Sequence, residues 1–417
     1  MLRALHLLAL AACLSALSAC AGATGNGDGG SSEPSGAGDH GPPVSTGAAG
    51  SADPRVSIHE RDGVAYVENP AAGLWEGAGR PPLRFELEAI YGAEADPEDA
   101  VLAAIGGAEV DPEGNVYVYD AGASQLVSFA ADGSVRWRSG GGGAGSGELG
   151  GVRGIAFDGA ETLWVLSRSG SQLDAWGVDG QHRGARQLAE AGLGDAYMGG
   201  SLPGGRLALM ENVFEAAAND YVILGLGAPL RVIERFRIAS EPEIVMPPGF
   251  IFQLSHHFAG DKIYIGNWQR YVLRVYDGRG NLLRHVSRAV DYLRRPGFAA
   301  RDPDQYAAMG LGGLGAPIVL ASGHWLVVAS WPTNVDDPDA YTALTADERP
   351  PIEWASSLDL FDAEGRFLHS LVTEGRPSPQ IGRPWAAGGD GRLYTVSADP
   401  FPQVRRYRVL IDPPAGR

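Results

Sequence analysis

The sequence is poor in cysteine and in lysine. Cys13 and Cys20 are its two cysteines, and Lys262 is the only lysine among 417 residues. Both cysteines lie near the N-terminus, so the chain beyond Cys20 cannot form a disulfide within itself. Arginine is therefore almost the only cation, which we attribute to biased codon usage and not to a binding site.

Positive charge as a whole is also scarce. The chain has 33 Lys and Arg residues against 50 Asp and Glu residues, and its formal net charge is -17 at pH 7. An acidic protein is repelled by the phosphates of nucleic acid and by anionic lipid surfaces. The charge therefore argues against nucleic acid, and against an anionic membrane surface, as the main partner.

The N-terminus has the order of a secretory signal. Arg3 precedes an apolar run, Leu5–Leu17, that is too short for a confident transmembrane helix. The run ends in Leu17-Ser18-Ala19-Cys20, which resembles the bacterial lipobox, where the cysteine is diacylated and becomes the new N-terminus. This interpretation predicts a lipoprotein signal peptide at residues 1–20, lipidation of Cys20 and anchoring to a lipid bilayer of the bacterial cell envelope, facing the periplasm or the exterior. The alternative is an ordinary cleavage site followed by a chance cysteine.

Residues 21–53 are dominated by Gly, Ser, Ala and Pro and have almost no large apolar side chain. Such a segment cannot bury enough apolar surface to offset the entropy lost on ordering. We expect a flexible tether here, followed by a folded domain at residues 54–417.

The stretch from Ile105 to about Leu188 repeats one pattern twice. The copies span residues 109–137 and 154–180, and a Gly-rich segment joins them. Each copy has four short apolar or aromatic runs separated by tight turn signals, which is typical of a four-stranded meander. A single meander cannot bury both faces, so it must stack on further copies. A ring of such units is a β-propeller.

The first copy also carries a family resemblance. An apolar strand ends at Asp111, and Gly114-Asn115-Val116-Tyr117-Val118-Tyr119-Asp120 follows. This order resembles the NHL-repeat propellers; the second copy matches fairly well and later copies keep only the skeleton. The resemblance implies the fold and says little of the chemistry, because that family includes binding modules and a few lyases and hydrolases.

The remaining sequence predicts four more blades, near residues 199–236, 252–286, 318–371 and 385–410. We therefore predict an all-β fold, a six-bladed β-propeller of four-stranded antiparallel blades. The last blade has three strands, and Leu83–Tyr91 is a strand without a blade. We expect this N-terminal strand to complete the last blade and close the ring, which removes a bare sheet edge. A hairpin is also expected from Val56–His59 and Val64–Val67.

The predicted loops differ between the two faces of the ring. Turns after the first and third strands of each blade are short, whereas loops after the second strand and between blades are longer. The longest are Asn212–Asp220, Asp291–Pro317 and Trp331–Ala355. Long loops in a compact domain are uncommon and often functional, although drift in tolerant surface loops is the alternative.

A polar residue ends the second strand of every predicted blade, on the face with the longer loops. These residues are Asp120, Ser167, Glu211, Asn267, Ser330 and Ser397. Two are followed by tryptophan, in Asn267-Trp268 and Ser330-Trp331. We predict a ligand site centred on Asn267, Trp268, Ser330 and Trp331, with Asp120 and Glu211 as further candidates. The alternatives are turn-forming residues that bond locally and tryptophans that pack beneath the insertions.

No catalytic motif is readable from spacing. His256 and His257 are adjacent in sequence, and two neighbouring histidines cannot easily bind one metal. The acids of the long loops lack the spacing of a calcium loop, and we expect no cofactor and no metal. The sequence favours a monomeric membrane-anchored propeller outside the cytoplasm that acts as a scaffold or binds a small molecule or a protein. The alternative is a lactonase-like propeller hydrolase or lyase, with or without a metal ion, acting at the central channel.

Overall fold

The computed structural model describes residues 55–414, apart from residues 78–81, 93–99, 144, 212–217, 240–254, 268–269, 291–312, 346–347, 375–380 and 399. The predicted signal peptide, Cys20 and the predicted tether lie outside the described residues. A search of the described part finds no helix that could span a membrane.

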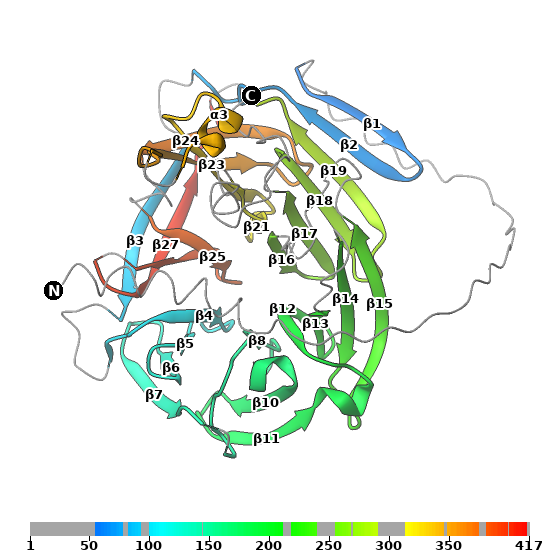
Figure 1. Cartoon of the computed structure of the whole chain (residues 1–417), viewed down its shortest axis with the longest axis vertical. Coiled ribbons are helices and arrows are strands. Elements are labelled where there is room, and N and C mark those ends of the chain that lie inside the picture. The colour runs from blue at the N-terminus through cyan, green and yellow to red at the C-terminus, as the bar shows by residue number, and fades with distance from the viewer. Residues whose placement is uncertain are drawn as a thin grey trace, which may run out of the picture. The chain divides into compact units, whose positions relative to one another are not determined.

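Six sheets surround a common centre, and the antiparallel strands of each form one blade of a propeller (Figure 1). Blade 1 contains β4 (Ile105–Val110), β5 (Val116–Asp120), β6 (Gln125–Phe129) and β7 (Val135–Gly140). Blade 2 contains β8 (Ile155–Phe157), β9 (Thr162–Ser167), β10 (Gln172–Gly177) and β11 (His182–Gln187). Blade 3 contains β12 (Ala196–Leu202), β13 (Arg206–Glu211), β14 (Ala218–Gly225) and β15 (Arg231–Ala239). In each case the chain proceeds from the innermost strand to the outermost.

The other three blades are more elaborate. Blade 4 contains β16 (Ser255–Ala259), β17 (Lys262–Asn267), β18 (Val272–Asp277) and β19 (Leu282–Arg288). Blade 5 contains β20 (Gly313–Leu314), β21 (Ile318–Val319), β22 (Trp325–Pro332), β23 (Trp354–Phe361) and β24 (Phe367–Glu374). Blade 6 contains β25 (Arg383–Ala387), β26 (Arg392–Ser397), β27 (Gln403–Ile411) and β3 (Leu83–Tyr91). The prediction of an all-β, six-bladed propeller is confirmed.

The core lies between neighbouring blades. One apolar cluster joins Tyr117 and Tyr119 of blade 1 to Ile155 and Trp176 of blade 2. Because the two faces of a blade pack against different neighbours, whole strands are buried, as in β5, where every residue is buried. Close approach also requires glycine: a side chain on Gly280, in a turn of blade 4, would overlap the ring of Phe236 in blade 3.

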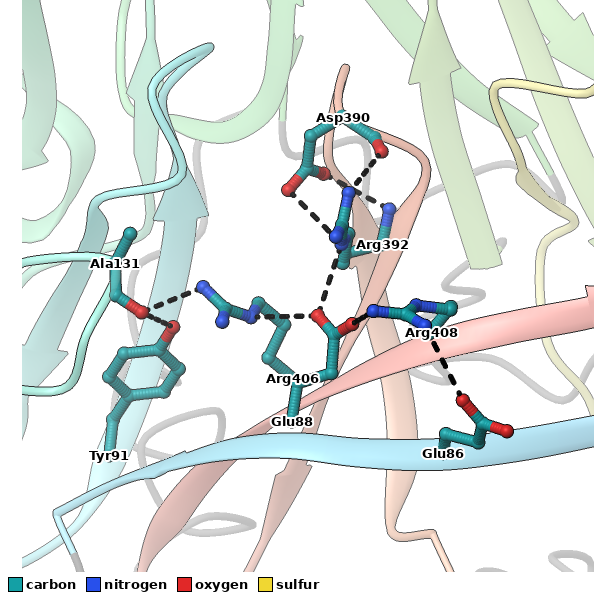
Figure 2. A network of polar contacts seen from close by, with 8 residues as sticks. All are labelled: Glu86, Glu88, Tyr91, Ala131, Asp390, Arg392, Arg406 and Arg408. Carbon is teal, nitrogen blue, oxygen red and sulfur yellow. Dashed lines mark hydrogen bonds and ion pairs between the residues drawn. The ribbon is translucent and has the colours of Figure 1, made fainter.

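The predicted closure of the ring is confirmed. Strand β3 pairs antiparallel with β27, from Ile411 opposite Leu83 to Val404 opposite Tyr91. Figure 2 shows the polar network that accompanies this pairing. Glu88 of β3 binds three arginines of blade 6, and Arg406 in turn donates to the carbonyl of Ala131 in blade 1, at 2.7 Å. The N-terminal strand is therefore tied to the last blade and, through it, to the first.

The predicted hairpin is present as β1 (Ser57–Arg61) and β2 (Val64–Asn69), but its position is a finding of the structure. Strand β2 pairs in parallel with β19, outside blade 4 (Figure 1). The buried side chain of Asn69 then donates to the carbonyls of Ser287 and Gly365, in blade 4 and in a turn of blade 5. Further along the segment, the backbone N–H of Leu74 donates to the carbonyl of Phe367 in blade 5, at 3.1 Å. The N-terminal segment thus binds blades 4, 5 and 6 in succession.

Two predicted loops are shorter than the sequence suggested. Strand β14 begins at Ala218, which pairs with Ala239 of β15, and Asp220 pairs with Glu211 of β13. The loop predicted at Asn212–Asp220 is therefore shorter by three residues. Strand β22 continues to Pro332, and Pro332 pairs with Trp354 of β23. The insertion of blade 5 is therefore residues 333–353, and it contains the helix α3 (Pro338–Ala343). In the predicted loop Asp291–Pro317, β20 is formed, and residues 291–312 lie outside the described part.

Candidate functional site

The two faces of the ring are built differently. On one face the connections are the short segments 111–115, 158–161, 203–205, 260–261, 320–324, 388–391, 130–134, 178–181, 226–230, 278–281 and 362–366. On the other face they include residues 141–154, between blades 1 and 2, and residues 333–353, within blade 5. We call these the short-turn face and the insertion face.

The blade 5 insertion, residues 333–353, is held by its own hydrogen bonds. The backbone N–H of Thr333 donates to the carbonyl of Glu353 at 2.8 Å, and Asn334 both donates to Pro351 and accepts from the backbone N–H of Glu353. The hydroxyl of Tyr341 donates to the carbonyl of Pro350 at 2.9 Å. Side chains that satisfy backbone groups in this way give a loop a defined shape. The described residues of the insertion therefore have a defined conformation on this face.

The inner strands surround the axis of the ring, and each begins on the insertion face. Strand β4 contacts β8 and β25, and β8 contacts β12 (Figure 1). The residues at the starts of these strands form what we call the ring mouth. Two arginines there lie over aromatic rings: Arg153 over Tyr197, at 4.5 Å from the ring centroid, and Arg383 over Trp385, at 4.8 Å.

Two groups on inner strands have strongly shifted pKa values. Burial raises the pKa of Glu109, on β4, to about 8, although the backbone N–H of Phe157 donates to its carboxylate and opposes the shift. Burial, and then the neighbouring His256, lower the pKa of His257, on β16, to about 4. The described residues contain no cluster of three or more His, Cys, Asp or Glu side chains that could hold a metal ion.

Asp120, a predicted site residue, ends β5 and is buried. Its carboxylate accepts hydrogen bonds from the backbone N–H groups of Ala103 and Ala104, both at 3.0 Å, and from those of Gly122 and Ala123. It therefore orders both the segment that enters blade 1 and the turn after β5. Bonding of this kind to nearby backbone groups is the alternative that the sequence analysis gave for the polar residues that end the second strands.

The other predicted residues are dispersed around the same face. Glu211, at the end of β13, forms an ion pair with Arg235 at 2.6 Å. Ser330 is buried in β22, with its Oγ 3.2 Å from that of Ser356. Asn267 ends β17, but its side chain, and Trp268 as a whole, lie outside the described residues.

Trp331 lies within β22 and not in the loop, and its half-buried ring packs against the core cluster of blades 4 to 6. A second tryptophan, Trp354, starts β23 opposite Pro332 and is also half-buried. The sequence analysis did not name Trp354. The two tryptophans stand at the base of the blade 5 insertion, on neighbouring strands.

The sequence analysis missed a polar network in blade 2 that reaches the segment between blades 1 and 2. Asp174 of β10 is buried and accepts from Ser167 Oγ at 2.5 Å and from Gln172 Nε2 at 3.0 Å. His182 Nε2 lies 2.9 Å from Asp174 Oδ1, and His182 Nδ1 lies 3.4 Å from the exposed Ser146 Oγ. The only signal in sequence was an acid in an otherwise apolar strand.

Blade 5 contains a related arrangement. Asp359 of β23 is fully buried and accepts from Arg288 Nη1 at 2.8 Å, from Ser370 Oγ at 2.6 Å and from the hydroxyl of Tyr271. The guanidinium of Arg288 also lies over the ring of Phe367, at 3.7 Å from its centroid. Arg288 and Tyr271 belong to the blade 4 region, so Asp359 joins blades 4 and 5.

These features define a six-bladed β-propeller with one elaborated face. No family model matches the chain, and no curated protein matches it in sequence. Solved structures match it in fold. A member of the DUF4221 family from Bacteroides vulgatus is 12% identical, with a TM-score of 0.50, over 79% of this chain and 98% of that one.

Two further structures are similar. A presumed exported protein from Bacteroides fragilis is 10% identical, with a TM-score of 0.52, over 83% of this chain and 99% of that one. A virginiamycin B lyase from Staphylococcus aureus is 10% identical, with a TM-score of 0.41, over 78% and 99%. At such identities the likeness shows the fold alone.

Proposed function

We propose that the chain is a lipid-anchored, extracytoplasmic β-propeller that binds a ligand, either a small molecule or a protein, on its insertion face. The observation that carries this proposal is the asymmetry of the two faces. Stability alone favours short connections on both, yet among the described residues the helix-bearing insertion at residues 333–353 lies on one face only. Binding residues are commonly placed on loops that a rigid scaffold positions.

The aromatic side chains of the insertion face supply the rest of the argument. Trp354, half-buried and opposite Pro332, offers apolar area at the base of the insertion, whereas Trp331, opposite Ala355, lies on the other face of the sheet and packs against the core. Hydrogen-bonding groups lie near Trp354, among them Ser330 on the same face of the sheet and the backbone of residues 333–353. Apolar area combined with a few fixed polar groups is the usual composition of a ligand site.

A binding screen tests the proposal. The full chain, purified in detergent, would be screened against small-molecule libraries by thermal shift and against envelope proteins by crosslinking, with W354A and W268A as test variants. R279A changes an exposed residue of a short turn and is the matched control. We expect a bound ligand to lose affinity in the tryptophan variants and to keep it in R279A. Unchanged binding in both tryptophan variants, with thermal stability preserved, would place the site elsewhere.

The anchor is supported by the lipobox-like Leu17-Ser18-Ala19-Cys20 and the Gly-rich segment at 21–53. Replacing Cys20 by serine removes the thiol that would be acylated. We expect the variant to leave the membrane fraction and become soluble. Membrane association that persists in the variant after washing would contradict the lipid anchor.

A second candidate function, a serine-type hydrolase, is favoured by the order Asp174, His182 and Ser146. A carboxylate that orients a histidine next to a serine hydroxyl is the arrangement that activates a nucleophile in acyl transfer. Here the carboxylate is buried and the serine is exposed, at the distances given above. Labelling by a fluorophosphonate probe that is lost in both S146A and H182Q would support this activity, and the absence of labelling would exclude it.

A further inference from the structure

Asp174 is a buried carboxylate whose oxygens are satisfied without a strong cation. Its side chain is 1% exposed, and among the described residues no lysine or arginine forms an ion pair with it. The hydroxyl of Ser167 donates to Oδ2 at 2.5 Å, and the amide of Gln172 donates to both oxygens at 3.0 Å. Asp359, by contrast, has the guanidinium of Arg288 beside it. Asp174 therefore depends on neutral donors that must be held in the right orientation.

A chain of two side-chain amides orients one of these donors. Gln187 precedes the short 3-10 helix η3 (Leu188–Ala191), and its side chain accepts the backbone N–H of Glu190. The Nε2 of Gln187 therefore points the other way and donates to Gln172 Oε1 at 2.8 Å. The Nε2 of Gln172 is then left to face Asp174. Because each amide fixes the direction of the next, this chain always delivers an N–H to the carboxylate.

The carboxylate in turn decides which nitrogen of His182 carries the proton. A carboxylate only accepts hydrogen bonds, so His182 Nε2, 2.9 Å from Asp174 Oδ1, is the donor. A neutral imidazole has one N–H, which leaves a lone pair on Nδ1. That nitrogen lies 3.4 Å from the exposed Oγ of Ser146, and the ring also contacts Trp176, with 5.0 Å between the ring centroids. The basic nitrogen of His182 therefore faces a hydroxyl group that solvent can reach.

We propose that Gln172 and Gln187 are positioning residues for the hydrolysis of an ester at Ser146. The inference rests on the second candidate function, the hydrolase, and deepens it by naming the substrate class. By orienting Asp174, the two amides keep the proton of His182 on Nε2, so that Nδ1 is free to act as the base. An ester is the expected substrate, because an alcohol leaves more readily than an amine.

The steps balance with water as the only co-reactant. As Ser146 Oγ forms a bond to the carbonyl carbon, its proton passes to Nδ1 of His182. The bond from that carbon to the alcohol oxygen then breaks, and the alcohol leaves with the proton from Nδ1. Water next adds to the acyl carbon and gives a proton to Nδ1, which returns it to Oγ as the carboxylic acid departs. Throughout these steps the Nε2–H stays on Asp174.

The tautomer of His182 is measured first, by long-range ¹H–¹⁵N NMR at alkaline pH on the full chain in detergent, with ¹⁵N in its nine histidines. The variant H182Q identifies the signals of His182. We expect a protonated Nε2 and an unprotonated Nδ1 in the parent, and a mixture of tautomers in Q172L and Q187L. In D174N, an amide N–H facing the ring should move the proton to Nδ1. Q181L makes the same change at an exposed turn of blade 2 and should keep the parental signals.

The rate of labelling by the fluorophosphonate probe is compared next, with folding verified by circular dichroism. Labelling of the parent at Ser146 should slow at least tenfold in Q172L and stay unchanged in Q181L. If the parent is labelled but Q172L and Q187L react at the parental rate, or if parental His182 carries its proton on Nδ1, the positioning role fails and the hydrolase stands. If the parent is not labelled, the hydrolase and the positioning role fail together, and ligand binding on the insertion face is unaffected.

Discussion

Replacing Glu88 by glutamine should loosen the closure of the ring. The carboxylate of Glu88 lies 3.1 Å from Arg392 Nε, 2.7 Å from Arg408 Nη2 and 3.5 Å from Arg406 Nε (Figure 2). Only 15% of its side chain is exposed, so the variant leaves three guanidiniums beside a neutral amide. The three arginines stay partly hydrated, which reduces the penalty.

The expected loss is about 2 kcal/mol of unfolding free energy. Hydrogen bonds to charged groups contribute about 1.5–3 kcal/mol, whereas exposed ion pairs contribute roughly 0–1 kcal/mol. The network of Glu88 lies between these limits, since one partner, Arg408, is half exposed. With roughly 2 cal/mol/K of unfolding entropy per residue, this loss corresponds to a fall in Tm of about 3 °C.

The pH dependence of the effect distinguishes the charge from the shape of Glu88. The hydrogen bond from Arg392 is the largest cause that lowers the pKa of this carboxyl group, and Arg408 adds to it against the opposing effect of burial. A depressed folded pKa means that the stabilisation is present above the ordinary carboxyl pKa and is lost as the pH falls through the folded value. The penalty of E88Q should therefore be complete at pH 7 and disappear in strong acid.

Urea denaturation of the parent and E88Q at several pH values measures this effect. E86Q is the matched control on the same strand, because Glu86 is 53% exposed and lies 3.7 Å from Arg408. We expect E86Q to change stability by less than about 0.5 kcal/mol. Equal losses in the two variants, or a loss in E88Q that does not depend on pH, would refute the reasoning.

Three further predictions concern the rest of the ring. Deleting residues 1–53 should leave a folded domain. Deleting residues 1–91 removes β3, the outer strand of blade 6, and should cause aggregation. Equal Tm values of the two truncated proteins would contradict the closure of the ring by β3. In the folded protein Glu109 keeps a proton that the unfolded chain releases above the ordinary carboxyl pKa. The free energy of unfolding therefore declines as the pH rises from that value to about 8. The change E109Q should raise the Tm more at pH 8 than at pH 5 in a calorimetric scan. The change D359N leaves the buried charge of Arg288 without its carboxylate and should cost about 3–5 kcal/mol in chemical denaturation. The exposed change D179N should cost less than about 1 kcal/mol, and similar losses in both variants would argue against the blade-joining role.

Much of the fold could be predicted from local patterns. The short apolar runs and their Asp-Gly turns define individual strands, and a glycine with positive φ, such as Gly114, is needed where the chain reverses. Closure of the ring by Leu83–Tyr91 followed from counting the predicted strands. The last blade had three strands, and Leu83–Tyr91 was a strand without a blade.

The parallel pairing of β2 with β19 could not be predicted in the same way. No local signal chooses a partner for a hairpin that lies far away in sequence, and Asn69 reaches Ser287 only in the folded ring. The end of β22 was also missed, since Trp331-Pro332 resembles the start of a loop. A proline is tolerated there because it lies at the end of the strand.

The predicted site residues were chosen by position, and position alone did not reveal their partners. Asp120 ends its strand as expected, but Ala103 and Ala104, whose backbone N–H groups it binds, lie in the segment that leads into the same blade and come close only when the blade forms. Asp174 and Asp359 were overlooked because an acid in a strand suggests a solvent-facing side. In a propeller both faces of a blade are covered, so these acids are buried.

The sequence by itself determined the number of blades, the strand that closes the ring and which face bears the longer loops, because periodicity and turn chemistry are local properties. The tertiary structure decided which side chains meet at the ring mouth. Arg153 and Tyr197 precede or begin the inner strands of different blades, and only stacking of the blades places a guanidinium over that ring. Contacts of this kind depend on the rotation from one blade to the next, which the packing between whole sheets sets and no short stretch of sequence encodes.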